Sequence, residues 1–537
     1  MSGHKSVQMR EIKMIKTLKY KKKLRLFLGQ VYILNALTEY RISKRNQAMV
    51  LAIVLINGCT VGPDFQRPSP PTVNHYLRAM PVAHERVQIK NVAIQHFDEN
   101  ATISNEWWTI FSSPTLNALV QQALIHNPSL VSAEAALRQA QEYVVEQGGY
   151  YYPTVQAGYS PGRQKNAVGT ISPTLTSGEP LYTLHTAQLS ISYAPDVFGL
   201  NRRTIESLQA QEESQRFQLE ATRLTLISNV VATAIQQAAI SAQIAATKNI
   251  IETEAKLMTL LQRQAELGFA SGLDVAAQET ALAQSEQTLP PLNKQLAQTR
   301  NLLAILAGKL PAEGGFDDFD LDRLQLPMSL PLTLPSKLVE QRPDVRAAEA
   351  QMHAASAQVG VAIANRLPQL SISAMYGGSA NKFSEMFLNN NIFWGVTGNL
   401  VQTIFDGGTL LHRQRATQAA FEQTTAQYRS IVLAAFQNVA DTLYAIDADN
   451  QALSAALKAD SASQKALLLT NAQLKLGATN ALVLLNAEQA NQQTRISKIQ
   501  SQAARFADTI ALYQALGGGA DIDKVDVTMR ARNAADF

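Results

Sequence analysis

The chain has 537 residues, 17% of them charged, and a formal net charge of +4 at pH 7. This positive balance comes from residues 1–58, which contain twelve Lys or Arg but only two acidic residues, Glu11 and Glu39. Without that stretch the chain holds 35 basic and 41 acidic residues, so binding to nucleic acid is not predicted. The single cysteine excludes an intramolecular disulfide framework.

Residues 1–58 are predicted to be a signal segment. Basic residues at 41, 44 and 45 precede nine apolar residues at 48–56 (AMVLAIVLI), too few to cross a bilayer but typical of a signal peptide. Residues 56–59 (INGC) resemble a bacterial lipobox, in which the cysteine becomes the lipidated mature N-terminus. Cys59 is therefore the predicted lipidation site, and a covalent lipid such as palmitate is the only attached group expected. The alternative is a small buried apolar residue.

An internal duplication follows. Residues 127–135 (NPSLVSAEA) lie 215 positions before residues 342–350 (RPDVRAAEA), and further on an offset of 209 relates Leu267-Gly268 to Leu476-Gly477. A period of this length excludes short-repeat solenoids and indicates a duplicated domain. The predicted segments are the leader at 1–58, a proline-rich lipidated tether at 59–105, repeats at 106–310 and 335–519, a connector at 311–334 and a tail at 520–537.

Each repeat contains one very long helical segment. Residues 201–267 and 413–476 contain neither Gly nor Pro. A helix of that length spans about 100 Å, because the rise is 1.5 Å per residue. Ile244, Ile251 and Met258 recur at sevens, which predicts a coiled-coil-like seam. A compact enzyme rarely needs such rods, so an enzyme is not predicted.

Shorter helices are predicted beside the rods, at 114–152, 273–307, 336–367 and 482–516. Their summed lengths allow two half-length helices to lie end to end beside each long one. Pro128 and Pro343 suit the first position of a helix, and Asn127 suits the N-cap before it. Pro290 and Pro291 are predicted to break or kink the helix at 273–307.

Alternating apolar and polar residues predict two strands in each repeat, at 154–160, 189–194, 370–376 and 392–401, with exposed loops at 161–185 and 377–391. These lengths suit tilted membrane strands, although strands of a soluble sheet alternate in the same way. Four strands cannot close a barrel, and an open sheet edge cannot lie in lipid. The membrane interpretation therefore requires several chains, and three would supply twelve strands.

Motifs in the same order along residues 59–519 resemble those of the lipoprotein branch of outer-membrane efflux proteins, the TolC-like channel-tunnels that work with resistance-nodulation-division pumps. The motifs are residues 59–68 (CTVGPDFQRP), 107–111 (WWTIF), 114–120 (PTLNALV), 198–203 (FGLNRR), 335–344 (PSKLVEQRPD), 404–408 (IFDGG) and 515–519 (ALGGG).

The resemblance implies a mixed α/β membrane protein. Its homotrimer would form a 12-stranded β-barrel, four strands per chain, in the outer membrane of a Gram-negative bacterium. A long α-helical coiled-coil barrel would continue across the periplasm. Drugs or other toxic small molecules would pass outward through this channel, and an inner-membrane resistance-nodulation-division pump would supply the energy. A periplasmic adaptor (membrane fusion) protein would join the channel to the pump. The alternatives are a duct for type I protein secretion and a periplasmic coiled-coil structural protein.

The turns after the two long helical segments are the predicted adaptor-contact sites. Gly268 and Gly477 suit left-handed positions at helix ends, and that structural role is expected in any case. The resemblance adds adaptor contact at Gly268, Ser271, Gly272, Gly477 and Asn480.

A periplasmic gate is predicted just beyond these turns, at Asp274, Val483 and Asn486. In the family, carboxylates often occupy the positions that match Val483 and Asn486. Neither residue ionises here, so a ring of three Asn486 side chains would be polar but uncharged.

Two patterns resemble active or metal sites and are interpreted otherwise. Gly158, Ser160 and Gly162 fit the nucleophile-elbow pattern, but Pro161 has no N–H to serve as oxyanion donor, so the end of a strand is predicted. The acidic residues Asp317, Asp318, Asp320 and Asp322 lack the spacing of a calcium loop and are predicted to be a solvated connector. Neither an HExxH motif nor a Cys/His cluster occurs, so no metal site is predicted.

Overall fold

The computed structural model describes residues 60–73, 75–77, 95–98, 101, 103–165, 181–313, 318–332 and 335–519. The chain falls into two units, residues 1–60 with 196–199 and residues 61–195 with 200–537. The helices and strands below belong to the second unit. The predicted leader, Cys59 and the tail at 520–537 lie outside the described residues.

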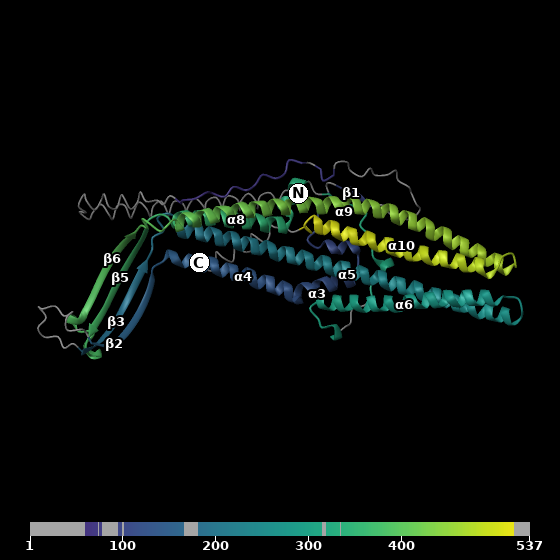
Figure 1. The fold of residues 1–537 in the computed structure, drawn as a ribbon, viewed down its shortest axis with the longest axis horizontal. Coiled ribbons are helices and arrows are strands. Elements are labelled where there is room, and N and C mark those ends of the chain that lie inside the picture. Colours follow the sequence, from purple (N-terminus) through teal and green to yellow (C-terminus); the bar gives the residue numbers. More distant parts are fainter. Residues whose placement is uncertain are drawn as a thin grey trace, which may run out of the picture. The chain divides into compact units, whose positions relative to one another are not determined.

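Two rods of equal length dominate this unit, α5 (Leu200–Glu266) and α9 (Thr409–Lys475), each of 67 residues. Each rod turns back into a 35-residue helix, α6 (Gly272–Leu306) after α5 and α10 (Ala481–Ala515) after α9. The result is two helical hairpins that contact each other through α5 and α10 (Figure 1). The two predicted rods are confirmed. One 18-residue window of α5 is apolar enough to cross a membrane, but 67% of it is buried inside the chain, as in a core helix.

Shorter helices accompany the other half of each rod, namely α3 (Pro114–His126), α4 (Pro128–Gly148), α7 (Pro335–Gln341) and α8 (Pro343–Ala364). Helix α4 packs on α5, and α8 packs on both α5 and α9, so α8 joins the two repeats. Pro128 and Pro343 open their helices as predicted. Asn127 caps α4, because its side-chain oxygen accepts the backbone N–H of Ser129 at 2.9 Å.

Of the break or kink predicted at Pro290 and Pro291, the break is wrong. Helix α6 runs unbroken from Gly272 to Leu306 with both prolines inside it. Proline removes a backbone hydrogen bond from a helix, so other contacts must offset the loss. Leu289 and Leu292, on either side of the prolines, pack against a buried cluster formed by Ile240, Ile244 and Leu296. This contact with α5 stabilises the helix where the prolines remove its backbone hydrogen bonds.

The seam of α5 also differs in part from its prediction. Ile244 is buried, but Ile251 and Met258 are only half-buried. The deeply buried residues that recur at sevens are instead Ile240, Thr247, Glu254 and Leu261. A heptad seam is therefore present, but it is shifted by three residues from the predicted positions. It contains the carboxylate of Glu254 where an apolar residue is expected.

Four strands form one antiparallel sheet in the order β2–β3–β5–β6. They are β2 (Thr154–Lys165), β3 (Leu181–Tyr193), β5 (Gln369–Ala380) and β6 (Ile392–Val401). The four strands are confirmed, but the predicted loops at 161–185 and 377–391 are too long, because β2, β3 and β5 extend into them. Pro161 lies within β2, opposite His185 of β3. Within one chain β2 is the outer strand of the sheet and pairs on one side only, a position where proline is tolerated.

The register places apolar and polar residues on opposite faces of the sheet. Ala157, Leu189, Tyr376 and Trp394 are successive cross-strand partners, and therefore share one face. A second apolar row consists of Val155, Ile191, Ala374 and Val396. On the other face, Thr154, Ser192, Ser373 and Thr397 form a polar row. One apolar and one polar face is the pattern of a membrane barrel with a polar interior.

The predicted tether and connector pair with each other. β1 (His96–Asp98) and β4 (Ser329–Pro331) form a two-stranded parallel sheet. Nearby, Trp107 lies in a buried 3-10 helix and stacks on Tyr513 of α10, with ring centroids 5.3 Å apart. These contacts attach segments outside the two hairpins to the middle of the helical bundle.

Candidate functional site

The predicted adaptor-contact and gate residues gather at two turns. The α5–α6 turn carries Gly268, Ser271, Gly272 and Asp274, and the α9–α10 turn carries Gly477, Asn480, Val483 and Asn486. Both turns lie at the end of the helical rods farthest from the sheet (Figure 1). Residues separated by more than 200 positions in the sequence are thus brought to one end of the molecule.

Helix-end geometry explains several of these residues. Gly268 and Gly477 have φ values of +79° and +70°, the left-handed conformation that glycine adopts without strain. Ser271 caps α6 in a capping box: its hydroxyl accepts the N–H of Asp274, and the Asp274 carboxylate accepts the N–H of Ser271 at 3.0 Å. Hydrogen bonds from the side chain and backbone of Ser271 lower the pKa of Asp274.

The second turn has a simpler cap. The side-chain oxygen of Asn480 accepts the N–H of Val483 at 3.1 Å, but valine cannot return a bond as Asp274 does. Val483 and Asn486 are exposed, whereas Leu484 and Leu485 between them are buried. The predicted gate positions of α10 therefore project away from the packed side of the hairpin.

The two turns are joined by an apolar cluster. Leu257 and Leu261 of α5 pack against Leu484 of α10, with Leu467 and Leu474 of α9 at its edge. Side chains at the very tips remain in solvent: Phe269 is 82% exposed and Leu476 is 84% exposed. Both side chains are therefore accessible to a partner at the end of each turn.

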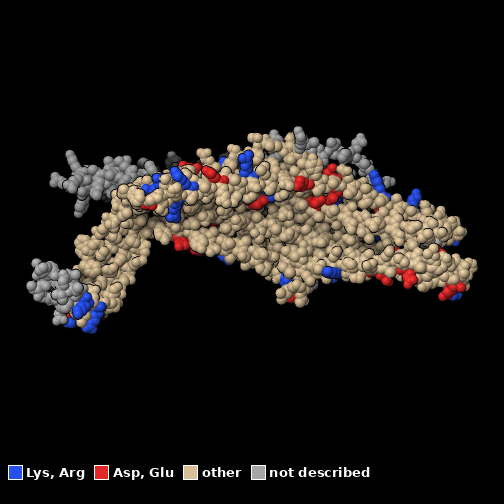
Figure 2. Space-filling model, in the orientation of Figure 1, with Lys and Arg blue, Asp and Glu red and all other residues tan. Residues whose placement is uncertain are grey.

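The sheet, at the end of the rods opposite the two turns, has one face with the surface expected of membrane strands that contact lipid. Its apolar face carries large exposed side chains, including Trp394, which is 75% exposed. Charged side chains are sparse over the sheet, and basic side chains gather where the strands end farthest from the helices (Figure 2). Arg163 and Lys165 lie at that end of β2. An apolar band ending in charged residues fits the hydrocarbon region and its boundary.

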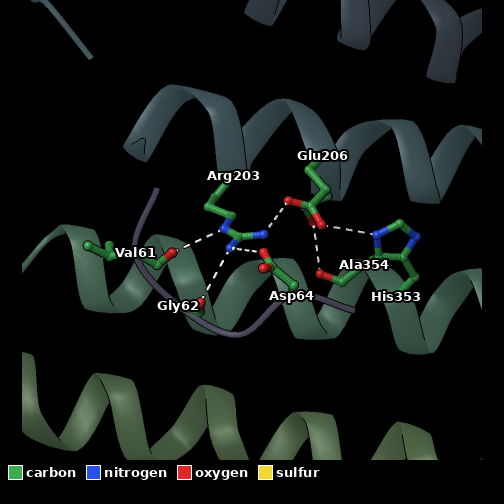
Figure 3. Close-up of polar contacts among 8 residues, drawn as sticks. Val61, Gly62, Asp64, Arg203, Glu206, His353 and Ala354 are labelled. Atoms are coloured by element: carbon green, nitrogen blue, oxygen red, sulfur yellow. Dashed lines mark hydrogen bonds and ion pairs between the residues drawn. The ribbon is translucent and has the colours of Figure 1, made fainter. Parts of the chain in front are cut away.

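A third feature, which the sequence analysis missed, is a clamp that holds the segment after Cys59. The clamp centres on Arg203 of α5, whose side chain is 4% exposed (Figure 3). Its guanidinium donates to the backbone oxygens of Val61 at 3.0 Å and Gly62 at 3.3 Å. It also pairs with Asp64 and Glu206, both at 2.7 Å. Burial would lower the pKa of Arg203, but the hydrogen bonds with Asp64 and Glu206 outweigh it and raise the pKa.

The clamped segment continues along α8. Phe65 stacks on His353, with ring centroids 4.3 Å apart. The imidazole in turn contacts Glu206 at 3.1 Å (Figure 3). Further on, Arg67 pairs with Glu349 at 2.9 Å. Within the predicted tether, residues 61–67 therefore run outside helix and strand and are docked on the helices. The signal for this clamp in the sequence was Arg203, which closes the 198–203 motif shortly after a glycine.

The patterns that resembled other sites have structural explanations. Ser160 lies inside β2 rather than at a strand end, and no helix follows it as an elbow requires. Asp318 forms an ion pair with Arg300 at 2.6 Å and accepts a hydrogen bond from Gln237 at 2.8 Å. Asp320 caps a short 3-10 helix, while Asp317 lies outside the described residues. Within the described ranges, no group of three or more His, Cys, Asp or Glu could hold a metal ion.

Known proteins are similar to this chain in sequence and in architecture. The family model for outer membrane efflux proteins matches residues 119–309 and 334–518. The pyoverdine export outer membrane protein OpmQ of Pseudomonas putida is 30% identical over 424 residues, covering 78% of this chain and 88% of that protein. The toluene efflux pump outer membrane protein TtgC, from another strain of the same species, is 26% identical, covering 88% and 95%.

A solved structure agrees in fold. The outer-membrane channel OprN has a TM-score of 0.76 and 27% identity, and the match covers 86% of this chain and 99% of that one. The relatives are matched over most of their lengths, and the two stretches of the family model contain both hairpins and the sheet. The chain therefore belongs to the outer membrane efflux protein family.

Proposed function

We propose that three copies of this chain form an outer-membrane duct that passively conducts drugs or other toxic small molecules from an inner-membrane pump to the exterior. The observation that carries the proposal is the four-stranded sheet, apolar on one face and polar on the other, continued by two helical hairpins of equal length. Such a duct positions no reactive group, so it needs no catalytic residue.

The open edges of the sheet support three copies. β2 and β6 are the outer strands, and each has one side unpaired within the sheet. In lipid, unpaired backbone groups are so unfavourable that a strand edge must find a partner. Pairing β2 of one copy with β6 of the next closes twelve strands around a polar interior, and the same rotation brings six helical hairpins into a ring.

The N-terminal clamp supports a lipid anchor on Cys59. The clamped segment runs along α8. Arg67 pairs with Glu349, and Gly62 lies against Gly360, close to the end of α8 that leads into the sheet. Cys59 precedes Gly62 by only three residues in the sequence, so a lipid on Cys59 would be tied to the helices through the clamp. An acyl chain there would start near the base of the barrel, where a lipid leaflet is within reach.

The hairpin turns are proposed to receive the periplasmic adaptor, with a pump of the resistance-nodulation-division type behind it. Phe269 and Leu476 give each turn an apolar tip that stands in solvent. Relatives named for pyoverdine export and for toluene efflux favour small molecules over secreted proteins as cargo.

In-cell photo-crosslinking tests this assignment. A photoreactive amino acid replaces Phe269 or Leu476, and the captured protein is identified by mass spectrometry. The expected product joins the chain to a periplasmic adaptor. Tyr152 is the matched control, because it is 69% exposed at the sheet end of the helices and should capture no adaptor. Capture of a secretion ATPase complex at the turns, or equal capture of the adaptor from position 152, would contradict the proposal.

A further inference from the structure

Two buried carboxylates lie at the contact between the hairpins, near enough for the charge of Glu254 to act on Glu488. Glu254 of α5 is 1% exposed and Glu488 of α10 is 6% exposed. They lie one to two turns from the apolar cluster of Leu257, Leu261 and Leu484, on the side toward the sheet. Glu254 belongs to the first repeat and Glu488 to the second, so the pair spans the contact between the two hairpins.

The polar contacts around this pair leave it incomplete. One carboxylate oxygen of Glu254 accepts the side-chain amide of Gln492 at 2.8 Å. Gln278 of α6 donates its amide to the backbone oxygen of Glu254 at 3.1 Å. The other carboxylate oxygen of Glu254, the side-chain oxygen of Gln278 and one oxygen of Glu488 are buried without a hydrogen-bond donor. Three acceptor oxygens from three helices thus lack a hydrogen.

Among the described residues, no basic side chain forms an ion pair with either carboxylate. Helix α6 contributes the uncharged Gln278, and α9 contributes Leu467 and Leu474 at this level. Asp460, a buried acid of α9, has its own partner, Lys498 of α10 at 3.4 Å. The charge that acts on Glu488 is that of Glu254. Two unpaired buried charges are strongly unfavourable, whereas one proton would remove a charge and supply a donor.

We propose that Glu254 and Glu488 form a proton-binding site, and that the proton held there keeps the two hairpins together near their turns. The proton comes from water and binds a carboxylate oxygen, and the new O–H donates to one of the oxygens left without a hydrogen. Burial, followed by the charge of Glu254, raises the pKa of Glu488 to about 7. The site therefore holds its proton in mild acid and releases it in mild alkali.

Release of the proton has a mechanical consequence. Both carboxylates are then charged and lack a counter-ion, so hydration of the seam becomes favourable and α5 and α10 separate locally. Under the proposed function, which this step presupposes, the separation widens the entrance of the duct. The binding of the proton itself does not depend on conduction, so it is tested without any transport measurement.

Amide hydrogen exchange of the full-length protein in detergent, at pH 6 and pH 8 and corrected for intrinsic rates, tests the site. In the wild type, residues 254–261 and 484–492 should exchange about tenfold faster at pH 8, because one pH unit above the pKa shifts a linked equilibrium by about a factor of ten. Glu488→Gln keeps the shape and removes the charge, so exchange should stay slow at both pH values. Glu254→Gln should do the same and replaces the first variant if that one does not fold.

Asp449→Asn is the matched control. Burial and a hydrogen bond with Asp508 raise the pKa of Asp449, but these two acids belong to α9 and α10 of the same hairpin. The control should keep the wild-type pH dependence at residues 254–261. Equal pH dependence in Glu488→Gln and the wild type would overturn the proposal. It would also be overturned if calcium restored protection at pH 8 and a chelator removed it, since the site would then bind a metal cation.

Discussion

Gly62 and Gly360 meet backbone to backbone: a Cβ atom built on Gly62 would lie 2.4 Å from the Cα of Gly360. Gly62 also has a φ of +96°, which L side chains rarely adopt. Arg203 lies against the other side of this contact, since a Cβ on Gly360 would lie 2.9 Å from the arginine Cγ. The segment that follows the predicted lipidation site is therefore held where only glycine fits.

Replacing Gly62 with alanine should undock this segment. The backbone strain alone is on the order of 1–3 kcal/mol, so protease cleavage within residues 61–73 should become roughly 5- to 150-fold faster. Gly149→Ala is the control, because Gly149 has helical angles and nothing lies within 4 Å of an added Cβ. Cleavage of Gly62→Ala at the wild-type rate would show that the close approach does not hold the segment.

Arg203→Ala should loosen the same segment by a different route. It removes the donors to Val61 and Gly62 and leaves Glu206 without its closest cation. A loss of about 1–3 kcal/mol in the docking free energy is expected, because Asp64 is exposed and its contribution is screened. A fluorophore attached near position 67, in protein that lacks Cys59, would report this loss of docking as increased mobility of the segment. Arg263→Ala breaks an exposed pair with Glu266 and should change nothing measurable.

Asn486→Asp should increase cation preference. Three added carboxylates around the proposed entrance form an anionic ring. In planar-bilayer recordings with a salt gradient, the reversal potential should therefore shift toward the equilibrium potential of the cation. Ala277→Asp places a carboxylate at the corresponding position of the first hairpin and should shift it less. An unchanged reversal potential in Asn486→Asp would remove Asn486 from the gate.

The capping box of the first turn should be lost in acid. The pKa of Asp274 is lowered by its bonds with Ser271, so its contribution is present at neutral pH and disappears as the pH falls through the folded-state pKa, below about 3.8. Exchange in the first turn of α6 should therefore be constant from pH 5 to pH 8 and rise below pH 4. Asp274→Asn should abolish that rise. The second turn, where Val483 replaces the carboxylate, should show no such step.

The long elements could be predicted from the sequence because their signals are local. Absence of Gly and Pro defines α5 and α9, and alternation defines the four strands. The errors arose where packing overrides local preference. Pro290 and Pro291 remain in a helix because Leu289 and Leu292 pack on α5, and Pro161 is tolerated in a strand that pairs on one side only within the chain.

The candidate site could be predicted less fully. Gly268 and Gly477 follow long helices, so their turns were recognisable. Ser271 and Asn480 cap the next helices, and this local role explains them without any contact to a partner. The Arg203 clamp depends on residues about 140 positions apart, and the Glu254–Glu488 pair on residues from different repeats. Such contacts become evident only when the register of the packed helices is known.

Electron cryomicroscopy of the protein extracted from the outer membrane tests the central claim, that several copies enclose one duct, most directly. The expected particle has three-fold symmetry, with β2 of each copy paired to β6 of the next and one lumen running from the sheet to the hairpin turns. A monomeric particle, or an assembly in which the edges of β2 and β6 remain unpaired, would contradict it.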